Sequence, residues 1–200
     1  LIKQDYDGLI PSLVSRKTCD LDAATYAVNV SRSEMVTFSA PILHTQFSAV
    51  VKISEKDKIS SFDQINSPGV VVAVMKGTEN DKYAQRYLPN VTVLYYNTLN
   101  DAVLSVLTGK ANIFMEDQTY VKIIHKKFAG QFVYIPPEKL EHNPLISIAF
   151  AMRKKDEKLI NSVNEFIKKS TENKTLQKLQ KDYLEDFIWQ KDFPLTKIGE

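Results

Sequence analysis

The chain has little of several residue types and patterns. Cys19 is its only cysteine, so no intramolecular disulfide bond can form. No apolar run approaches the ~20 residues that a transmembrane helix needs. The net charge is only +2 and no basic or acidic block occurs, which disfavours a nucleic-acid partner. Repeats, low-complexity tracts and Gly/Ser linkers are also missing. The 200 residues, 44% hydrophobic and 25% charged, can still bury a sizeable core as one domain or two small lobes.

The common catalytic signatures are missing as well. The sequence contains no GxSxG turn, Walker A loop, GxGxxG fingerprint or HExxH motif. His44, His125 and His142 are far apart and lack the spacing of metal ligands. We therefore expect neither a metal site nor a cofactor, and no residue is assigned a catalytic role.

Strands and helices alternate along the chain. Apolar runs predict strands over 19–25, 47–53, 70–75, 91–95, 111–115, 132–135 and 145–152. Helical spacing predicts helices over 7–17, 60–65, 78–87, 97–107 and 117–126. Apolar residues at helical spacing predict two more helices towards the C-terminus. One stripe is Ile160, Val163, Phe166 and Ile167, and the other is Leu176, Leu179, Tyr183 and Phe187. Such alternation is typical of βαβ units, so the sequence predicts an α/β fold with mainly parallel sheets.

The strands over 47–53 and 145–152 enclose a central block of alternating elements. If both cross between two parts of the fold, the central block forms one lobe and the two ends of the chain form the other. Ligands of such folds bind in the crevice at the carboxyl ends of the strands.

A glycine turn separates the apolar strand at 70–75 from the next helix, in the segment KGTENDKYA. Gly77 allows close approach of the backbone, and the first amides of a helix can bind a carboxylate or phosphate. The alternative is a plain Thr78 N-cap behind a glycine turn, and this segment alone leaves both open. Glu79 suits the helix dipole but disfavours a second anion beside it.

An acidic pair ends the strand at 111–115, in the segment GKANIFMEDQTYVKII. Asp117 can cap the following helix or accept a hydrogen bond from a cation. Tyr120 lies three residues on, on the same helix face, as a core aromatic or as the wall of a pocket.

A single arginine, Arg32, follows small and apolar residues in the segment YAVNVSRSEMVTFSAP. It is either a surface charge, paired for example with Glu34, or a guanidinium that points at an anion.

Three segments occur in one order: DYDGLIPSLVSRKTCDLDAATYAVNVSR with VTFSAPIL, then KGTENDKYA, then GKANIFMEDQTYV. Together they resemble the amino-acid-binding branch of the type II periplasmic solute-binding proteins, the family 3 extracellular solute-binding proteins. The resemblance covers essentially the whole chain. It implies a two-lobed α/β fold with two crossover hinge strands, with lobe 1 at 1–48 and 149–200 and lobe 2 at 49–148.

The resemblance also implies roles for individual residues. Family members clamp the ligand carboxylate with an arginine and backbone amides of both lobes, and an aspartate takes the α-ammonium. Arg32 matches the arginine and Asp117 the aspartate, with Tyr26 and Tyr120 as candidate walls. The ligand-binding residues implied in this way are Arg32, Thr25, Ala27, Gly77, Thr78, Glu79, Asp117, Tyr120 and Tyr26.

The chain also departs from the family. Asn29 replaces the usual Thr or Ser, and Ala27 lacks a hydroxyl that many members contribute. The family's first strand and helix, which precede DYDGLIP, are expected to be missing, so lobe 1 is expected to be incomplete. Cyclohexadienyl dehydratases of the same fold are similar too, but Tyr120 stands where they carry a glutamate general acid. A tyrosine with a pKa of ~10 is a poor acid for a leaving hydroxyl.

The expected function is therefore that of an extracytoplasmic solute-binding protein. It would capture a small carboxylate-bearing ligand, an amino acid, between two lobes and deliver it to the membrane permease of an ABC transporter. A dehydratase-like enzyme and the ligand-sensing domain of a receptor are the alternatives. The expected location is periplasmic or extracellular, with a lipid anchor as one option, and no nucleic acid takes part.

Overall fold

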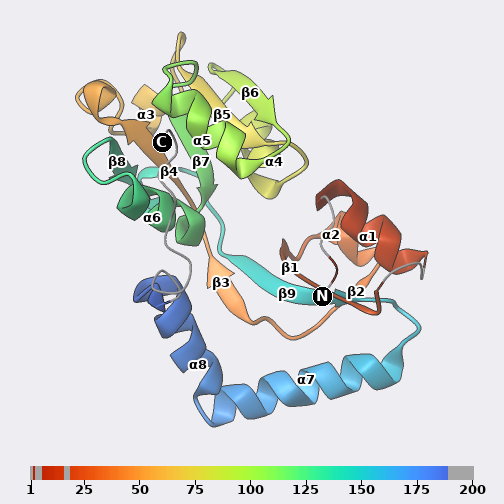
Figure 1. The fold of residues 1–200 in the computed structure, drawn as a ribbon. Helices are drawn as coiled ribbons and strands as arrows, with labels where there is room; N and C mark the ends of the chain where they lie inside the picture. The colour runs from red at the N-terminus through yellow and green to blue at the C-terminus, as the bar shows by residue number, and fades with distance from the viewer. Residues whose placement is uncertain (1, 3–5, 16–18, 189–200) are drawn as a thin grey trace. The chain divides into compact units, whose positions relative to one another are not determined.

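The computed structural model describes residues 2, 6–15 and 19–188 and divides the chain into two compact units (Figure 1). Unit 1 comprises residues 1–44 and 146–200, and unit 2 comprises residues 45–145. The chain therefore passes between the units twice. Within the described residues, no helix has both the length and the apolar character that crossing a bilayer requires.

Unit 1 is a small sheet built around one long strand. Its elements are α1 (Tyr6–Val14), β1 (Leu21–Ala27), α2 (Val30–Ser33), β2 (Thr37–Phe38), β3 (Leu43–Thr45, which ends in unit 2), β9 (Ile146–Met152), α7 (Glu157–Glu172), α8 (Thr175–Gln180) and the π-helical turn η3 (Lys181–Glu185). Strand β9 pairs antiparallel with β1 and β2, and β3 also pairs with it. The apolar stripe of α1 buries Ile10 and Leu13 against Tyr26, Val36 and Ala151, whereas Val14 is exposed.

Unit 2 is a five-stranded sheet with the order β6-β5-β7-β4-β8. Its elements are β4 (Phe47–Lys52), the 3-10 turn η1 (Ile53–Glu55), α3 (Phe62–Ile65), β5 (Val71–Met75), α4 (Glu79–Tyr87), β6 (Thr92–Tyr96), α5 (Leu99–Leu107), β7 (Ile113–Asp117), α6 (Gln118–Lys127), β8 (Phe132–Ile135) and the 3-10 turn η2 (Pro137–Lys139). As its apolar run predicts, β5 is buried through Val72, Ala73 and Val74.

The prediction of mainly parallel sheets is wrong. In unit 2, β5 runs parallel to β6 and β7, but β4 lies antiparallel to both β7 and β8. Strands joined through a helix share one direction, as the alternation predicts for β5, β6, β7 and β8. Strand β4 enters from unit 1 in the opposite direction and is inserted between β7 and β8. The alternation of strands and helices does not predict the direction of such a strand. The sheet of unit 2 is therefore mixed, and in unit 1 β1 and β2 pair antiparallel with β9.

The helices that follow the strands of unit 2 start at defined caps. Thr78 and Thr98 accept hydrogen bonds through their side chains from the amides of Asp81 and Asp101, and Asp117 accepts from Thr119 and Tyr120. Each cap satisfies backbone donors that the first turn would leave unpaired. These caps fix α4 and α6 directly behind β5 and β7, where the candidate residues of this unit lie.

Candidate functional site

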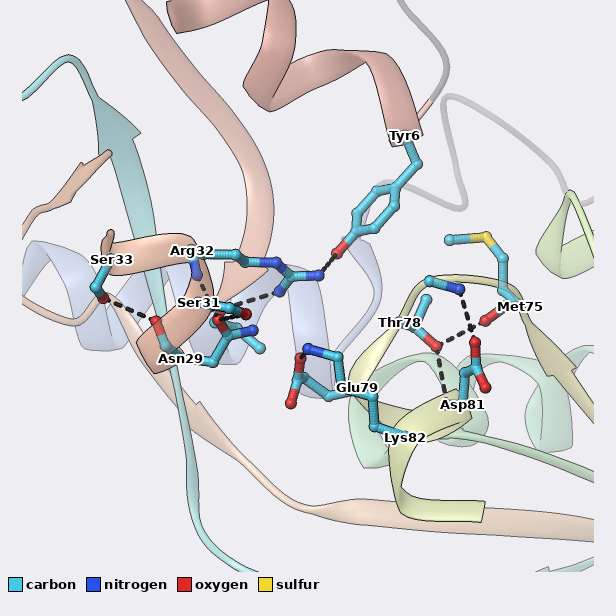
Figure 2. Close-up of polar contacts among 12 residues, drawn as sticks. Tyr6, Asn29, Ser31, Arg32, Ser33, Met75, Thr78, Glu79, Asp81 and Lys82 are labelled. Carbon is cyan, nitrogen blue, oxygen red and sulfur yellow. Dashed lines mark hydrogen bonds and ion pairs between the residues drawn. The ribbon is translucent and has the colours of Figure 1, made fainter. Parts of the chain in front are cut away.

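In unit 1 the candidate residues lie at the end of β1 and in the short helix α2 (Figure 2). Asn29 caps this helix: its Oδ1 accepts from the Arg32 amide at 2.8 Å and from the Ser31 hydroxyl at 3.0 Å. The Ser33 hydroxyl donates to the Asn29 carbonyl oxygen at 2.8 Å. Asn29, a departure from the family at the sequence level, therefore holds the turn that carries Arg32.

Arg32 is buried, with 7% of its surface exposed, so its interpretation as a surface charge is wrong. Its Nη1 donates to the Ala27 carbonyl oxygen at 3.0 Å, and its Nη2 donates to the Tyr6 hydroxyl at 3.1 Å (Figure 2). The guanidinium carbon also lies 4.8 Å from the centre of the Tyr26 ring, within cation–π range. Contacts from three directions fix the plane of the guanidinium.

Two aromatic residues support this arginine. The rings of Tyr6 and Tyr26 are 5.0 Å apart, and the Tyr26 hydroxyl donates to the Tyr6 carbonyl oxygen at 3.2 Å. Burial, followed by the charge of Asp22, raises the pKa of Tyr26, so its phenol stays neutral. Thr25 precedes Tyr26 in β1, and Ala27 contributes the carbonyl oxygen that Arg32 contacts.

In unit 2 the Gly77-Thr78 turn is tied to the first turn of α4. Gly77 has a φ of 78°, which an L-residue rarely adopts, and its amide donates to Asp81 Oδ2 at 2.9 Å. The Thr78 hydroxyl donates to the Met75 carbonyl oxygen at 2.8 Å and accepts from the Asp81 amide (Figure 2). Glu79 forms an ion pair with Lys82 at 2.8 Å. The Gly77 amide thus serves this internal cap, while Thr78 and Glu79 open the helix.

Asp117 ends β7 and caps α6. Its Oδ1 accepts from the amides of Thr119 at 2.9 Å and Tyr120 at 3.3 Å. Burial raises the pKa of this carboxyl, and the same amide hydrogen bonds oppose the rise. A cation beside Asp117 would favour its charged form, which suits the expected contact with an ammonium group.

Tyr120 is partly buried in the first turn of α6, with its ring 6.0 Å from that of Phe114 in an edge-to-face arrangement. Burial, and then the charges of Glu116 and Asp117, raise its pKa to about 12. The phenol is therefore a weaker acid than a free tyrosine, and it packs on the core cluster of this unit.

A buried polar contact beside these residues was not predicted from the sequence. Asn80, in the first turn of α4, donates through Nδ2 to Glu116 Oε1, and the Asp117 amide donates to the same oxygen at 3.0 Å. This contact brings the start of α4 and the end of β7 together, and with them the two groups of candidate residues in unit 2. The contact between Tyr6 and Arg32 was not predicted from the sequence either. The sequence did contain one signal for Glu116, namely a carboxyl inside a strand predicted to be buried. Such a group requires hydrogen-bond partners.

Residues 1–186 match the family of bacterial extracellular solute-binding proteins, family 3. The chain is 24% identical over 170 residues to the glutamate-binding protein GluB of Corynebacterium glutamicum. The matched region covers 84% of this chain and 57% of that protein. The chain thus spans little more than half the length of this relative.

Two further similarities concern the dehydratases. The chain is 26% identical over 98 residues to the cyclohexadienyl dehydratase of Pseudomonas aeruginosa, covering 49% of this chain and 37% of that enzyme. Among solved structures, it is similar to the ancestral amino acid-binding protein AncCDT-1, a precursor of cyclohexadienyl dehydratase. That likeness has a TM-score of 0.82 and 28% identity, and it covers 92% of this chain and 77% of that one.

Proposed function

The chain belongs to the bacterial extracellular solute-binding proteins of family 3, and on this basis we propose that it binds a free amino acid. In this proposal Arg32 would hold the carboxylate of the ligand, and Asp117 would hold its ammonium group. Members of the family act outside the cytoplasm, in the periplasm or extracellular space. Delivery of the ligand to the permease of an ABC transporter, and a lipid anchor, are further parts of the proposal.

The observation that carries the proposal is the fixed, buried guanidinium of Arg32. Burying an arginine is costly unless its donors are matched, and here both terminal nitrogens donate to oriented oxygens. A guanidinium held in one plane loses little freedom when a carboxylate binds to its fork of donors. Fixing its direction in this way is preparation for a planar anion.

The ammonium group of the ligand would bind to Asp117 in unit 2. Asp117 presents a carboxyl group whose Oδ1 is already held by two backbone amides. An ammonium ion would offset the cost of keeping this carboxyl charged in a buried place. The start of α4 at Thr78 and Glu79 would offer the positive end of the helix dipole to the carboxylate. Thr25 and Ala27 would add backbone contacts, and Tyr26 and Tyr120 would form walls.

A titration panel tests this proposal. Isothermal titration with L-glutamate, L-arginine and L-glutamine covers an acidic, a basic and a neutral side chain on the same carboxylate and ammonium groups. The proposal predicts that the protein binds at least one of them, and that decarboxylated or N-acetylated forms of that amino acid bind far more weakly. Equal binding of the decarboxylated form would contradict the roles assigned to Arg32 and the α4 amides.

A second candidate function is dehydration of prephenate or arogenate, which the similarity to the cyclohexadienyl dehydratase favours. Tyr120, at the position of the dehydratase general acid, is a poor proton donor with its pKa raised to about 12. We therefore favour binding over catalysis. Ultraviolet detection of phenylpyruvate from prephenate separates the two, since turnover by the protein would overturn the binding function.

A further inference from the structure

The contact between Asn80 and Glu116 joins two elements of unit 2 at a buried point. Asn80 is 2% exposed and Glu116 is 8% exposed. Glu116 Oε1 accepts from Asn80 Nδ2 and from the Asp117 amide. One carboxyl oxygen thus receives hydrogen bonds from α4 and from the end of β7.

The same two side chains leave one buried atom each without a hydrogen-bond partner among the described residues. These atoms are Glu116 Oε2 and Asn80 Oδ1. Both are acceptors when the carboxyl is ionised, so neither can satisfy the other, and each unsatisfied group lowers stability. A proton on Glu116 Oε2 changes this, because a protonated carboxyl is a donor and the amide oxygen is an acceptor.

The surroundings favour that proton. Burial, and then the charge of Asp117, raise the pKa of Glu116 to about 8. The titratable groups that interact with it are Asp117 on β7 and Tyr120 on α6, and the tyrosine stays neutral. On β4 the residue in register with Glu116 is Ser48, which is uncharged. Near neutral pH the side chain therefore carries a proton that the amide oxygen can accept.

We propose that Asn80 and protonated Glu116 form a two-hydrogen-bond acid–amide pair that fixes the first turn of α4 to the end of β7. The pair is a positioning device. It sets the Thr78 and Glu79 amides and the Asp117 carboxyl in one geometry, which the two charged groups of an amino acid then match. This role rests on the proposed function, but the pair itself does not depend on a ligand.

Two variants of Glu116 separate positioning from mere stability. Glu116→Gln keeps one acceptor and one donor and can form the same reciprocal pair with Asn80. Glu116→Leu keeps a similar volume but neither group. Isothermal titration with L-glutamate, L-arginine and L-glutamine should give a Kd about tenfold weaker for Glu116→Leu at unchanged stoichiometry, with Glu116→Gln within about twofold of the wild type. A fall in stoichiometry at unchanged Kd would show a purely structural role and overturn the proposal.

Amide hydrogen exchange tests the pair without a ligand. In Glu116→Leu, exchange should accelerate at the first turns of both α4 and α6, at Asp81 and Thr119, while Glu116→Gln matches the wild type. Glu165→Leu, on the exposed face of α7, is the matched control and should change neither turn. If the wild type binds no amino acid, the proposed function fails, whereas unchanged exchange in Glu116→Leu would refute the pair itself.

Discussion

The raised pKa of Glu116 predicts a specific dependence of stability on pH. Burial and the charge of Asp117 move this pKa from an ordinary value of 4.5 to about 8. Between these two values the folded protein keeps a proton that the unfolded chain releases, so rising pH favours the unfolded state. The free energy of unfolding should therefore fall as the pH rises from about 5 to about 8.

The size of this effect follows from linkage. One proton retained in the folded state alone changes the free energy of unfolding by at most about 1.4 kcal/mol per pH unit. From about pH 5.5 to about pH 7.5, Glu116 should thus lower stability by about 2 kcal/mol. The charge of Asp117 adds to the rise in the Glu116 pKa, so the contribution of Glu116 is measured as the difference between the wild type and Glu116→Gln, which cannot ionise.

Urea denaturation followed by circular dichroism measures this difference. We expect the wild type to lose stability over this interval relative to Glu116→Gln. Glu165→Gln is the matched control, since Glu165 is exposed and paired with Lys169, and it should follow the wild type. Parallel pH profiles for the wild type and Glu116→Gln would refute the assignment of a protonated carboxyl at this position.

Three further predictions concern other contacts. Phe114→Ala empties a fully buried position in the core of unit 2 and should cost about 3–5 kcal/mol in urea denaturation, whereas a loss below 1 kcal/mol would contradict the packing. Asn143→Ala removes three side-chain hydrogen bonds, two to the backbone of Phe47 and one to Pro137, and should cost about 2–3 kcal/mol; an unchanged urea midpoint would contradict these contacts. Tyr6→Phe removes only the hydroxyl that Arg32 contacts and should lower stability by about 1 kcal/mol in the same assay, and no loss at all would show that this hydrogen bond contributes nothing.

The sequence predicted well those elements whose signals are local. The strand over 132–135 has the predicted bounds, because an apolar run there is bounded by turn residues. The starts of α4 and α6 follow from Thr78 and Asp117, which cap them through bonds to residues two or three positions on. Local hydrogen bonding of this kind is visible in a sequence pattern.

Features that depend on distant partners were not predicted. Strands β2 and β3 are too short to show a pattern and exist through pairing with β9, more than a hundred residues away. The direction of β4 likewise depends on its pairing with the distant strands β7 and β8. The spacing places Phe166 in an apolar stripe, yet this residue is 64% exposed in α7, since spacing alone does not show which positions a neighbouring element covers.

In the candidate site, too, the residues matched by a motif were predicted, whereas their distant partners were not. The resemblance pointed to Arg32 and Asp117, but the burial of Arg32 depends on Tyr6, which lies 26 residues away. The Asn80–Glu116 contact joins residues 36 positions apart, so no local pattern reveals it. Supporting contacts of this kind come from the tertiary structure rather than from any motif.

The central claim is that Arg32 holds the carboxylate of an amino acid, and one titration tests it directly. Removing one partner of a desolvated charge pair costs about 2–5 kcal/mol, so Arg32→Ala should weaken the Kd for the bound amino acid by at least about thirtyfold. Arg86→Ala, which changes an exposed arginine on α4, should bind like the wild type. Tight binding by Arg32→Ala, equal to that of the wild type and Arg86→Ala, would contradict the claim.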